Sequence, residues 1–470
     1  MTVPAASAGT WNGVRRDAFL TTVDSRRSLT VAAPHDASSA KARRRARTSF
    51  LLAALATLSL LLAGQARAGE GWAVNLKADA YGPQRFLAVD KSSQTFWIFE
   101  QKSPLSPVKQ LPCTTGQEPG TKWKEGDLKT PEGVYFIKQR INGGLDFSLY
   151  GDLAFTLNYP NPIDVINGRK GSGIWIHGRG KPITPNESRG CVALNNPDIK
   201  ELDPQLTKRV LPVVIANEVH WSKDDPVVSK EGQEVVAATL EWAKAWSRKS
   251  EAFFAFHDAQ KFSVSTGEPF ENFRGHKRQL FAKLPWIHVL IDDVRAVQGP
   301  DYWVTYFGQL YRSPTLSSEG IKRLYWQRNA EGRMVIVGMD YDETTLGLET
   351  KYVERVRPEV LKVVEAWRQA WEKGKVADYV QFYADNATQG DRKGRAAIRD
   401  HKQQLWTGAK APKKVAARDM KFSLAQDGVL VEFVQEYASR DGVADKGRKK
   451  LVLGPSGDGW LIMDEDWSKL

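Results

Sequence analysis

The sequence predicts a multi-domain fold in which a mostly-β domain is followed by two α+β domains. Three observations lead to this prediction. At 470 residues the chain is too long for one ordinary hydrophobic core. Short β-like runs separated by Pro and Gly fill the part that follows the N-terminal leader. The C-terminal half then repeats itself.

The first predicted domain, residues 69–219, is rich in strand-like runs. Residues 86–89 and 95–99 are apolar, are joined by a short polar turn and predict a hairpin. Further runs are found at 133–137, 173–176 and 210–215. Asn196 followed by Pro197 predicts the start of a short helix, with Asn196 as its N-cap.

The repeat has an offset of 125 to 127 residues. Four pairs of segments match in the same order: 242–246 with 367–371, 276–281 with 401–406, 307–311 with 433–437, and 331–336 with 458–463. We therefore predict two copies of one domain, at residues 232–345 and 358–470. Each copy opens with amphipathic helices and closes with alternating strands, which in the second copy are expected at 420–424, 429–437, 450–453 and 460–463.

Residues 1–68 predict a secretory leader. A basic stretch at 41–47 precedes an apolar run at 50–63, and Ala66-Arg67-Ala68 resembles a cleavage site. The apolar run is shorter than the roughly 20 residues that a membrane span needs, although an uncleaved anchor is the alternative. Either way the body of the protein is expected in the periplasm or cell envelope.

The net charge of +12 is concentrated in this leader. Residues 1–68 hold ten Lys and Arg against three Asp, a charge of +7, which leaves +5 for the rest of the chain. A mildly basic body suits an anionic polymer such as the cell wall. The sequence has no nucleic-acid motif, metal-ligand cluster, phosphate loop or nicotinamide fingerprint, so we expect no nucleic-acid partner, no metal and no cofactor.

The stretch with the clearest chemistry combines His177 and Cys191. The run 173–178 delivers His177 to the end of a strand, and a loop rich in Gly and Pro leads to Ser188-Arg-Gly-Cys191. A thiol is a nucleophile as thiolate, so its free pKa of about 8.5 is expected to be lowered by a neighbouring His. His177 would take the thiol proton, and the N–H groups of Gly190 and Cys191 would form an oxyanion hole.

The alternative is a disulfide. Two cysteines in an exported chain, Cys113 and Cys191, are by default candidates for pairing. The Ser-x-Gly-Cys turn behind His177-Gly178 favours a reactive thiol instead. Cys113 is then interpreted as a small buried hydrophobic residue.

His177-Gly178 together with Ser188-Arg-Gly-Cys191 resembles the signature of the L,D-transpeptidase catalytic domain, the YkuD-type fold. Residues 130–134 and 157–161 are also similar to segments of that domain, and the resemblance spans about 85–217. The order of elements in the repeat, with its Trp-x-x-x-Trp helix, resembles the NTF2-like cone fold. The implied fold class is a mostly-β YkuD-type domain followed by two α+β NTF2-like cone domains.

This resemblance implies an activity. Cys191 would attack the tetrapeptide stem of peptidoglycan, release D-Ala and form a thioacyl-enzyme. An amine from a second stem would then give a 3→3 cross-link, whereas water would give a tripeptide. The resemblance implies that His177 is the base, Ser188 orients it and Gly190 supplies an oxyanion N–H. It also points to Gly178, Arg189, Tyr159 and Asn161 as substrate-binding residues.

Two departures from the family pattern bear on the reaction. Arg189 stands where many members have a second His, and Ala193 stands where many have Arg. A subgroup with Ala at that position and an NTF2-like domain includes cell-shape L,D-carboxypeptidases, so hydrolysis is the alternative to cross-linking. A non-catalytic wall-binding scaffold is the second alternative. The C-terminal domains are expected to bind a wall or envelope partner.

The chain contains 16 Trp, which suit either a core or stacking on sugars. The pairs Trp242/Trp246 and Trp367/Trp371 share a helix face at i,i+4 and recur in both copies. This recurrence predicts a shared core for them.

Overall fold

The computed structural model describes residues 71–470 except 103, 208–209, 225 and 458. The predicted leader lies outside these residues. No helix among the described residues is long and apolar enough to cross a membrane.

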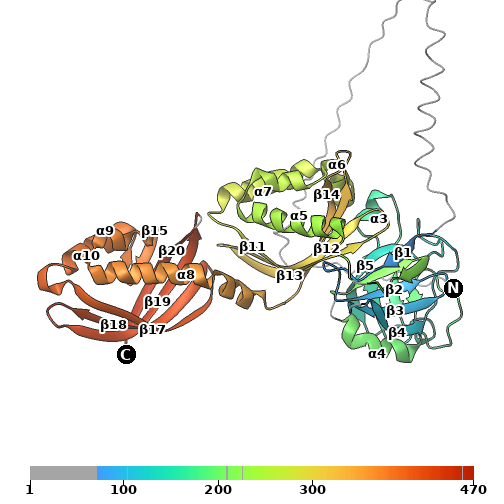
Figure 1. Cartoon of the computed structure of the whole chain (residues 1–470), viewed down its shortest axis with the longest axis horizontal. Helices are drawn as coiled ribbons and strands as arrows, with labels where there is room; N and C mark the ends of the chain where they lie inside the picture. The colour runs from blue at the N-terminus through green and yellow to red at the C-terminus, as the bar shows by residue number, and fades with distance from the viewer. Residues whose placement is uncertain (1–70, 103, 208–209, 225, 458) are drawn as a thin grey trace, which may run out of the picture. The chain divides into compact units, whose positions relative to one another are not determined.

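The first domain is built on an eight-stranded sheet with the strand order β4-β3-β2-β9-β5-β6-β7-β8 (Figure 1). The strands are β2 (Arg85–Asp90), β3 (Thr95–Glu100), β4 (Ser106–Pro112), β5 (Gly133–Ile141), β6 (Ala154–Leu157), β7 (Trp175–His177), β8 (Val192–Ala193) and β9 (Pro212–Ala216). Every residue of β9 is buried, as its Val/Ile-rich sequence requires of a central strand. A separate parallel pair joins β1 (Ala73–Leu76) to β10 (Glu218–Trp221).

Three short helices complete this domain: α2 (Phe147–Tyr150), α3 (Pro162–Ile166) and α4 (Asn196–Leu206). The prediction that Asn196 caps α4 is wrong by one residue, because the N-cap is Asn195. The side chain of Asn196 bonds instead to Asp152, at the N–H and at the carboxylate. Sequence alone does not separate two adjacent asparagines.

The repeat appears as two α+β domains, which we call the first repeat domain (residues 230–343) and the second repeat domain (residues 348–469). The first has α5 (Lys230–Ser247), η1 (Glu251–Phe256), α6 (Ala259–Thr266) and α7 (Phe270–Lys283), followed by β11 (His288–Gln298), β12 (Trp303–Ser313), β13 (Leu316–Arg328) and β14 (Met334–Glu343). These strands form a consecutive antiparallel sheet, with α5 and α7 on one side of it (Figure 1).

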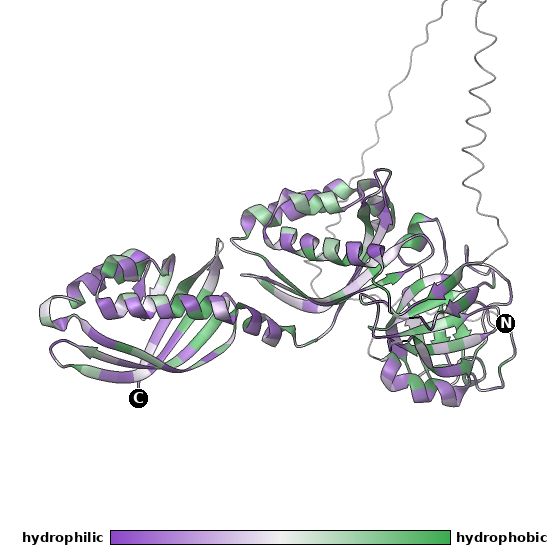
Figure 2. Ribbon diagram, viewed as in Figure 1, coloured by the Kyte–Doolittle hydropathy of each residue, from purple (hydrophilic) through white to green (hydrophobic). Residues whose placement is uncertain are grey.

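The second repeat domain begins with the long helix α8 (Leu348–Lys373), whose apolar residues recur every three or four positions and are buried (Figure 2). It continues with α9 (Val376–Val380), β15 (Tyr383–Gln389), β16 (Arg392–Lys393), α10 (Arg395–Leu405) and η2 (Gly408–Lys410). Four long strands close it: β17 (Pro412–Ala425), β18 (Gly428–Ser439), β19 (Ala444–Ser456) and β20 (Gly459–Lys469). Each predicted strand lies within one of these: 420–424 at the C-terminal end of β17, 429–437 and 450–453 inside β18 and β19, and 460–463 at the N-terminal end of β20.

The paired tryptophans lie in the two cores, as predicted. The rings of Trp242 and Trp246 are 5.2 Å apart, and so are those of Trp367 and Trp371. All four side chains are buried. These four tryptophans therefore cannot stack on sugar rings.

The first repeat domain shares a hydrophobic core with the first domain. Val134 and Phe136 of β5 pack in one cluster with Tyr302, Tyr306 and Tyr325. The hydroxyl of Tyr302 accepts the backbone N–H of Val134 at 2.8 Å. Burial of this kind is typical of a domain interior.

A buried charge network reinforces the same contact. Arg323 is fully buried and forms ion pairs with Asp340 and Asp342, each at 2.7 Å. From the first domain, Lys138 pairs with Asp342, and Asn158 donates to Asp340 at 3.1 Å. Polar side chains of the first domain thus bond to the carboxylates of the first repeat domain that also pair with Arg323.

A different contact joins the two repeat domains. The guanidinium of Arg312, in β12, is buried and donates to the main-chain carbonyl oxygens of Ala425, Gln426 and Gly428. These carbonyls form the turn between β17 and β18. Gly428 has φ +157, and a Cβ there would lie 1.9 Å from the carbonyl oxygen of Leu453.

Candidate active site

Cys191 and His177 are brought together by two adjacent parallel strands. In the register of β7 and β8, His177 pairs with Ala193 and Ile176 with Val192. Cys191 therefore lies opposite Trp175, one step before β8. Because side chains two residues apart share a face of a strand, Cys191 and His177 project from the same face of the sheet.

The hydrogen bond of His177 determines which ring nitrogen can act as a base. Nδ1 lies 2.6 Å from the carbonyl oxygen of Gly178, so Nδ1 carries the proton and Nε2 accepts. Burial lowers the pKa of His177 to about 4, although its bond to Gly178 favours the protonated ring. At neutral pH the residue is thus a neutral imidazole with Nε2 available for a proton.

The thiol differs from the prediction. Burial raises the pKa of Cys191 to about 11, although the N–H of Trp175 and the ammonium of Lys122 favour the thiolate. The sulfur donates to the carbonyl oxygen of Gly173 at 3.4 Å. This direction is opposite to the expected lowering, because burial of the thiol outweighs the groups that favour the thiolate.

The turn around Gly190 is organised by two hydroxyl groups. Ser188 Oγ donates to the carbonyl oxygen of Cys191 at 2.6 Å and accepts the N–H of Gly190 at 3.1 Å. Thr130 Oγ1 donates to the carbonyl oxygen of Gly190 at 3.0 Å. Two predictions differ from these bonds. Ser188 bonds to the turn and not to His177, and the N–H of Gly190 donates to Ser188 and is not open to an oxyanion.

Gly190 itself is required by its conformation. Its φ is +126, and a Cβ would lie 2.8 Å from the carbonyl oxygen of Lys129. A side chain here would push the Cys191 turn away from the segment that carries Thr130.

The four predicted substrate-binding residues differ in their solvent exposure: one is exposed and three are buried. Arg189 is exposed beside the turn. Gly178 is buried against α4, where a Cβ would lie 2.6 Å from Asn196 Oδ1, and its carbonyl orients His177. Tyr159 is buried and donates to the carbonyl oxygen of Lys170, and Asn161 caps α3. The polar groups of Gly178, Tyr159 and Asn161 are thus engaged inside the domain, and their contact with substrate stays a prediction.

Cys113 and Cys191 are both free thiols. Cys113 lies in the core of the first domain, with 3% of its surface exposed. This agrees with its interpretation as a buried hydrophobic residue. The disulfide on which the scaffold alternative depends is not formed in this structure.

Sequence reasoning missed Tyr150. Its ring makes an edge contact with His177 at 5.1 Å and a tilted contact with Trp175 at 5.3 Å. Burial, and then the negative charge of Cys191 when it is ionised, raise the pKa of Tyr150, so its hydroxyl stays protonated. It belongs to α2, a segment without a recognisable motif.

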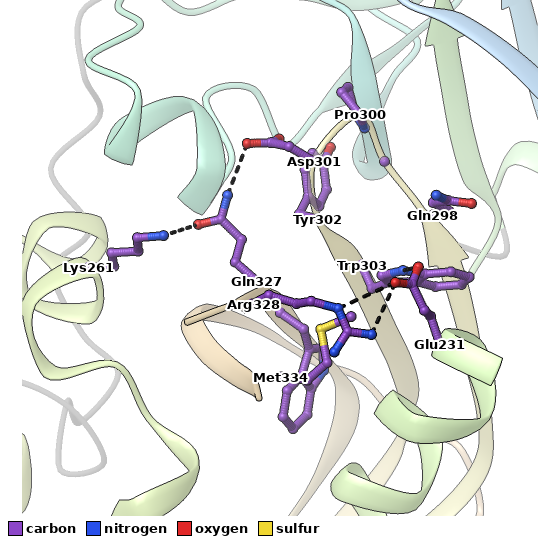
Figure 3. Close-up of a pocket in the computed structure, with 12 residues that line it drawn as sticks. Glu231, Lys261, Gln298, Pro300, Asp301, Tyr302, Trp303, Gln327, Arg328 and Met334 are labelled. Carbon is purple, nitrogen blue, oxygen red and sulfur yellow. Dashed lines mark hydrogen bonds and ion pairs between the residues drawn. The ribbon is translucent and has the colours of Figure 1, made fainter. Parts of the chain in front are cut away.

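A separate cavity of about 420 Å³ lies on the first repeat domain (Figure 3). Its polar side chains bond to one another: Arg328 pairs with Glu231 at 3.0 Å, and Gln327 bonds to both Lys261 and Asp301. Five polar side chains of the cavity are thus bonded to one another.

The pKa values predict how the site responds to pH. Cys191 becomes a thiolate only above about pH 11, so its alkylation by iodoacetamide should keep rising up to that pH. Because His177 stays neutral above about pH 4, kcat/KM should fall only on acidification towards that value. Intact-mass spectrometry over a pH series measures the alkylation, with Cys191→Ala as the blank. If alkylation already reached a plateau near neutral pH, Cys191 would be a thiolate there. That result would contradict an uncharged thiol and an uncharged imidazole at neutral pH.

Comparison with known proteins agrees with this geometry. The family profile of the L,D-transpeptidase catalytic domain matches residues 84–215. The profile of the Cds6 C-terminal NTF2-like domain matches twice, at 234–339 and 359–466. Among curated proteins, none matches this sequence significantly.

Two solved structures are similar over part of the chain. Bd1075 of Bdellovibrio bacteriovorus is 27% identical, with 58% of this chain and 97% of that chain covered and a TM-score of 0.43. The helical cell shape determining protein Pgp2 of Campylobacter jejuni is 24% identical, with 60% and 98% covered and a TM-score of 0.42.

The fold and the profile matches define the domains of this protein: an L,D-transpeptidase catalytic domain of the YkuD type at residues 84–215, followed by two tandem copies of an NTF2-like domain. The catalytic domain is that of a family of cysteine-based, peptidoglycan-modifying enzymes. The predicted fold class is confirmed.

Proposed function

We propose that the protein is a peptidoglycan L,D-transpeptidase that uses Cys191 as its nucleophile and acts in the periplasm or cell envelope. The observation that carries this proposal is the shared face of Cys191 and His177 on adjacent strands, with Nε2 of His177 left to accept a proton. A neutral thiol beside a neutral base suits attack coupled to proton transfer.

The steps follow from the two side chains. The thiol proton moves to Nε2 of His177 as the sulfur bonds to the stem-peptide carbonyl. The tetrahedral intermediate then expels D-Ala, whose leaving amine takes that proton, and a thioacyl-enzyme remains. An amine from a second stem attacks the thioester, gives its proton to His177 and releases Cys191 as a thiol with a 3→3 cross-link.

The N–H of Cys191 is the oxyanion donor in this scheme. It belongs to the same trans peptide as the carbonyl of Gly190, which Thr130 holds. Because N–H and C=O of a trans peptide point in opposite directions, this bond aims the Cys191 N–H away from Thr130.

Hydrolysis is the second candidate, and Ala193 favours it. Ala193 is fully buried between β7 and the segment of Thr114, so the chain supplies no cation at this position to hold an incoming stem. Water would then take the thioester and leave a tripeptide, which is the L,D-carboxypeptidase reaction.

Product analysis distinguishes the two reactions. The purified protein is incubated with tetrapeptide-rich sacculi, and the muropeptides are identified by mass spectrometry. Dimers joined 3→3 are expected for the transpeptidase, and tripeptide monomers alone would assign the carboxypeptidase. No Cys191-dependent change in either product would overturn the enzymatic proposal in favour of the scaffold.

The second repeat domain supports binding to the wall. A cavity of about 580 Å³ is lined by two buried lysines, Lys402 and Lys449, and one buried glutamate, Glu465. Burial opposes ionisation of Glu465, but Lys449 and Lys402 lower its pKa to about 2. These three buried side chains together carry one positive charge, which suits a carboxylate of a stem peptide, while the rest of the lining holds Arg392 and Lys410 against Asp441, Asp445 and Asp466.

We expect Lys402→Met to weaken binding to sacculi by about tenfold, because the excess cation is lost. Burial lowers the pKa of Lys402 to about 8, so binding by the unmodified protein should also weaken as pH rises through 8. Co-sedimentation with sacculi measures both effects. The matched control is Lys450→Met, which removes an exposed lysine of the same sheet paired only with Glu432. Equal losses in the two variants would remove the cavity from the proposal.

A further inference from the structure

We propose that Trp123 is a binding platform for a sugar ring of the glycan strand that carries the stem peptide. The inference rests on the proposed peptidoglycan substrate. Most tryptophans of the described chain are buried or half-buried, whereas 52% of Trp123 is exposed. A flat, exposed indole offers the surface on which the apolar face of a pyranose packs.

The loop that carries Trp123 is held firmly in place. The carboxylate of Asp127 accepts the N–H of Trp123 at 2.7 Å and the N–H of Lys124 at 3.0 Å. It also accepts Lys122 Nζ at 2.7 Å. Burial raises the pKa of Asp127, but these bonds outweigh it and lower the pKa to about 2, so the clamp persists at neutral pH.

The indole ring is also fixed from one side. The guanidinium carbon of Arg169 lies 5.4 Å from the ring centroid of Trp123, and Arg169 is itself anchored by the buried Asp164 at 2.8 Å. One face of the ring is thus covered, and the exposed area is left for a ligand. Pre-organisation of this kind reduces the entropy lost when a ligand binds.

The position of Trp123 relative to Cys191 fits such a ligand. The carbonyl of Trp123 accepts the N–H of Lys170 at 2.8 Å, and Gly173 accepts the Cys191 thiol. Lys170 and Gly173 are three residues apart, so their backbones are separated by at most about 10 Å. Three stem residues separate the sugar from the scissile carbonyl, and they too span about 10 Å when extended. Sugar and carbonyl can therefore reach Trp123 and Cys191 together.

The test compares two substrates that differ only in the sugar: a disaccharide-tetrapeptide and the free tetrapeptide. With Trp123→Ala we expect KM for the disaccharide-tetrapeptide to rise about tenfold, with kcat and the free tetrapeptide unaffected. Trp123→Phe should recover much of the loss. The matched control is Lys124→Ala, an exposed neighbour on the same clamped loop, which should leave both substrates unaffected.

An equal loss on both substrates, or no loss on either, would overturn the role of Trp123. Turnover of neither substrate by the unmodified protein would instead count against the proposed chemistry. In that case calorimetric titration of disaccharide-tetrapeptide into the unmodified protein and Trp123→Ala still decides the platform: weaker binding by the variant supports it and equal binding overturns it.

Discussion

Cys191→Ala should abolish the release of D-Ala and every new muropeptide, a loss on the order of 10⁴-fold or more in kcat. In the proposed reaction the sulfur of Cys191 forms the acyl bond, and the other cysteine of the chain cannot replace it, because Cys113 lies in the core. The variant should fold normally, since it removes one half-buried atom from a surface turn. Muropeptide analysis with circular dichroism checks both parts.

Cys113→Ala is the matched control for this substitution. It removes the same atom from the core of the same domain, so it should cost about 1 kcal/mol or more of stability but leave the reaction intact. Residual turnover by Cys191→Ala, or complete loss in a folded Cys113→Ala protein, would contradict the assignment of the nucleophile.

The largest effect on stability is expected for Arg323→Ala. Its guanidinium is fully buried between Asp340 and Asp342 and lies 4.5 Å from the ring centroid of Phe136 in the first domain. Its removal leaves buried carboxylates with less compensation, which costs about 3–5 kcal/mol. Urea unfolding should show the first domain and the first repeat domain losing structure together at a lower midpoint.

Arg328→Ala provides the comparison. Arg328 stands at the end of the same strand and pairs with Glu231 and Glu234, but all three side chains are about two-fifths exposed. Exposed pairs are worth at most about 1 kcal/mol, so this variant should unfold near the unmodified protein. Similar midpoints for the two variants would show that the buried network does not stabilise the contact.

The sequence alone singled out Cys191 and His177 as the proposed nucleophile and base, because both stand in short motifs whose residue types indicate their chemistry. It also revealed the repeat, since helix and strand patterns recur at one offset. Tyr150 and Trp123 were not singled out. Neither belongs to a motif, and their proximity to Cys191 depends on loops from distant parts of the chain.

Two kinds of property could not be predicted from the sequence, for a common physical reason. Tyr159 and Asn161 stand in a family-like segment, but sequence does not tell whether a side chain turns towards the cleft or into the domain. The pKa of Cys191 likewise depends on burial, which outweighs the neighbouring groups. Orientation and solvent exposure are properties of the packed chain, and a motif contains neither.

The hydrogen bonds from Arg312 to the turn between β17 and β18 determine which substitutions this turn can accept. The guanidinium donates to three main-chain oxygens, so these hydrogen bonds depend on the backbone conformation of the turn. The exposed side chain of Gln426 should therefore tolerate substitution, whereas the charge of Asp427 favours the protonated form of Arg312. Gly428 should not tolerate substitution, because any larger residue would collide with the carbonyl oxygen of Leu453 and change the conformation of the turn.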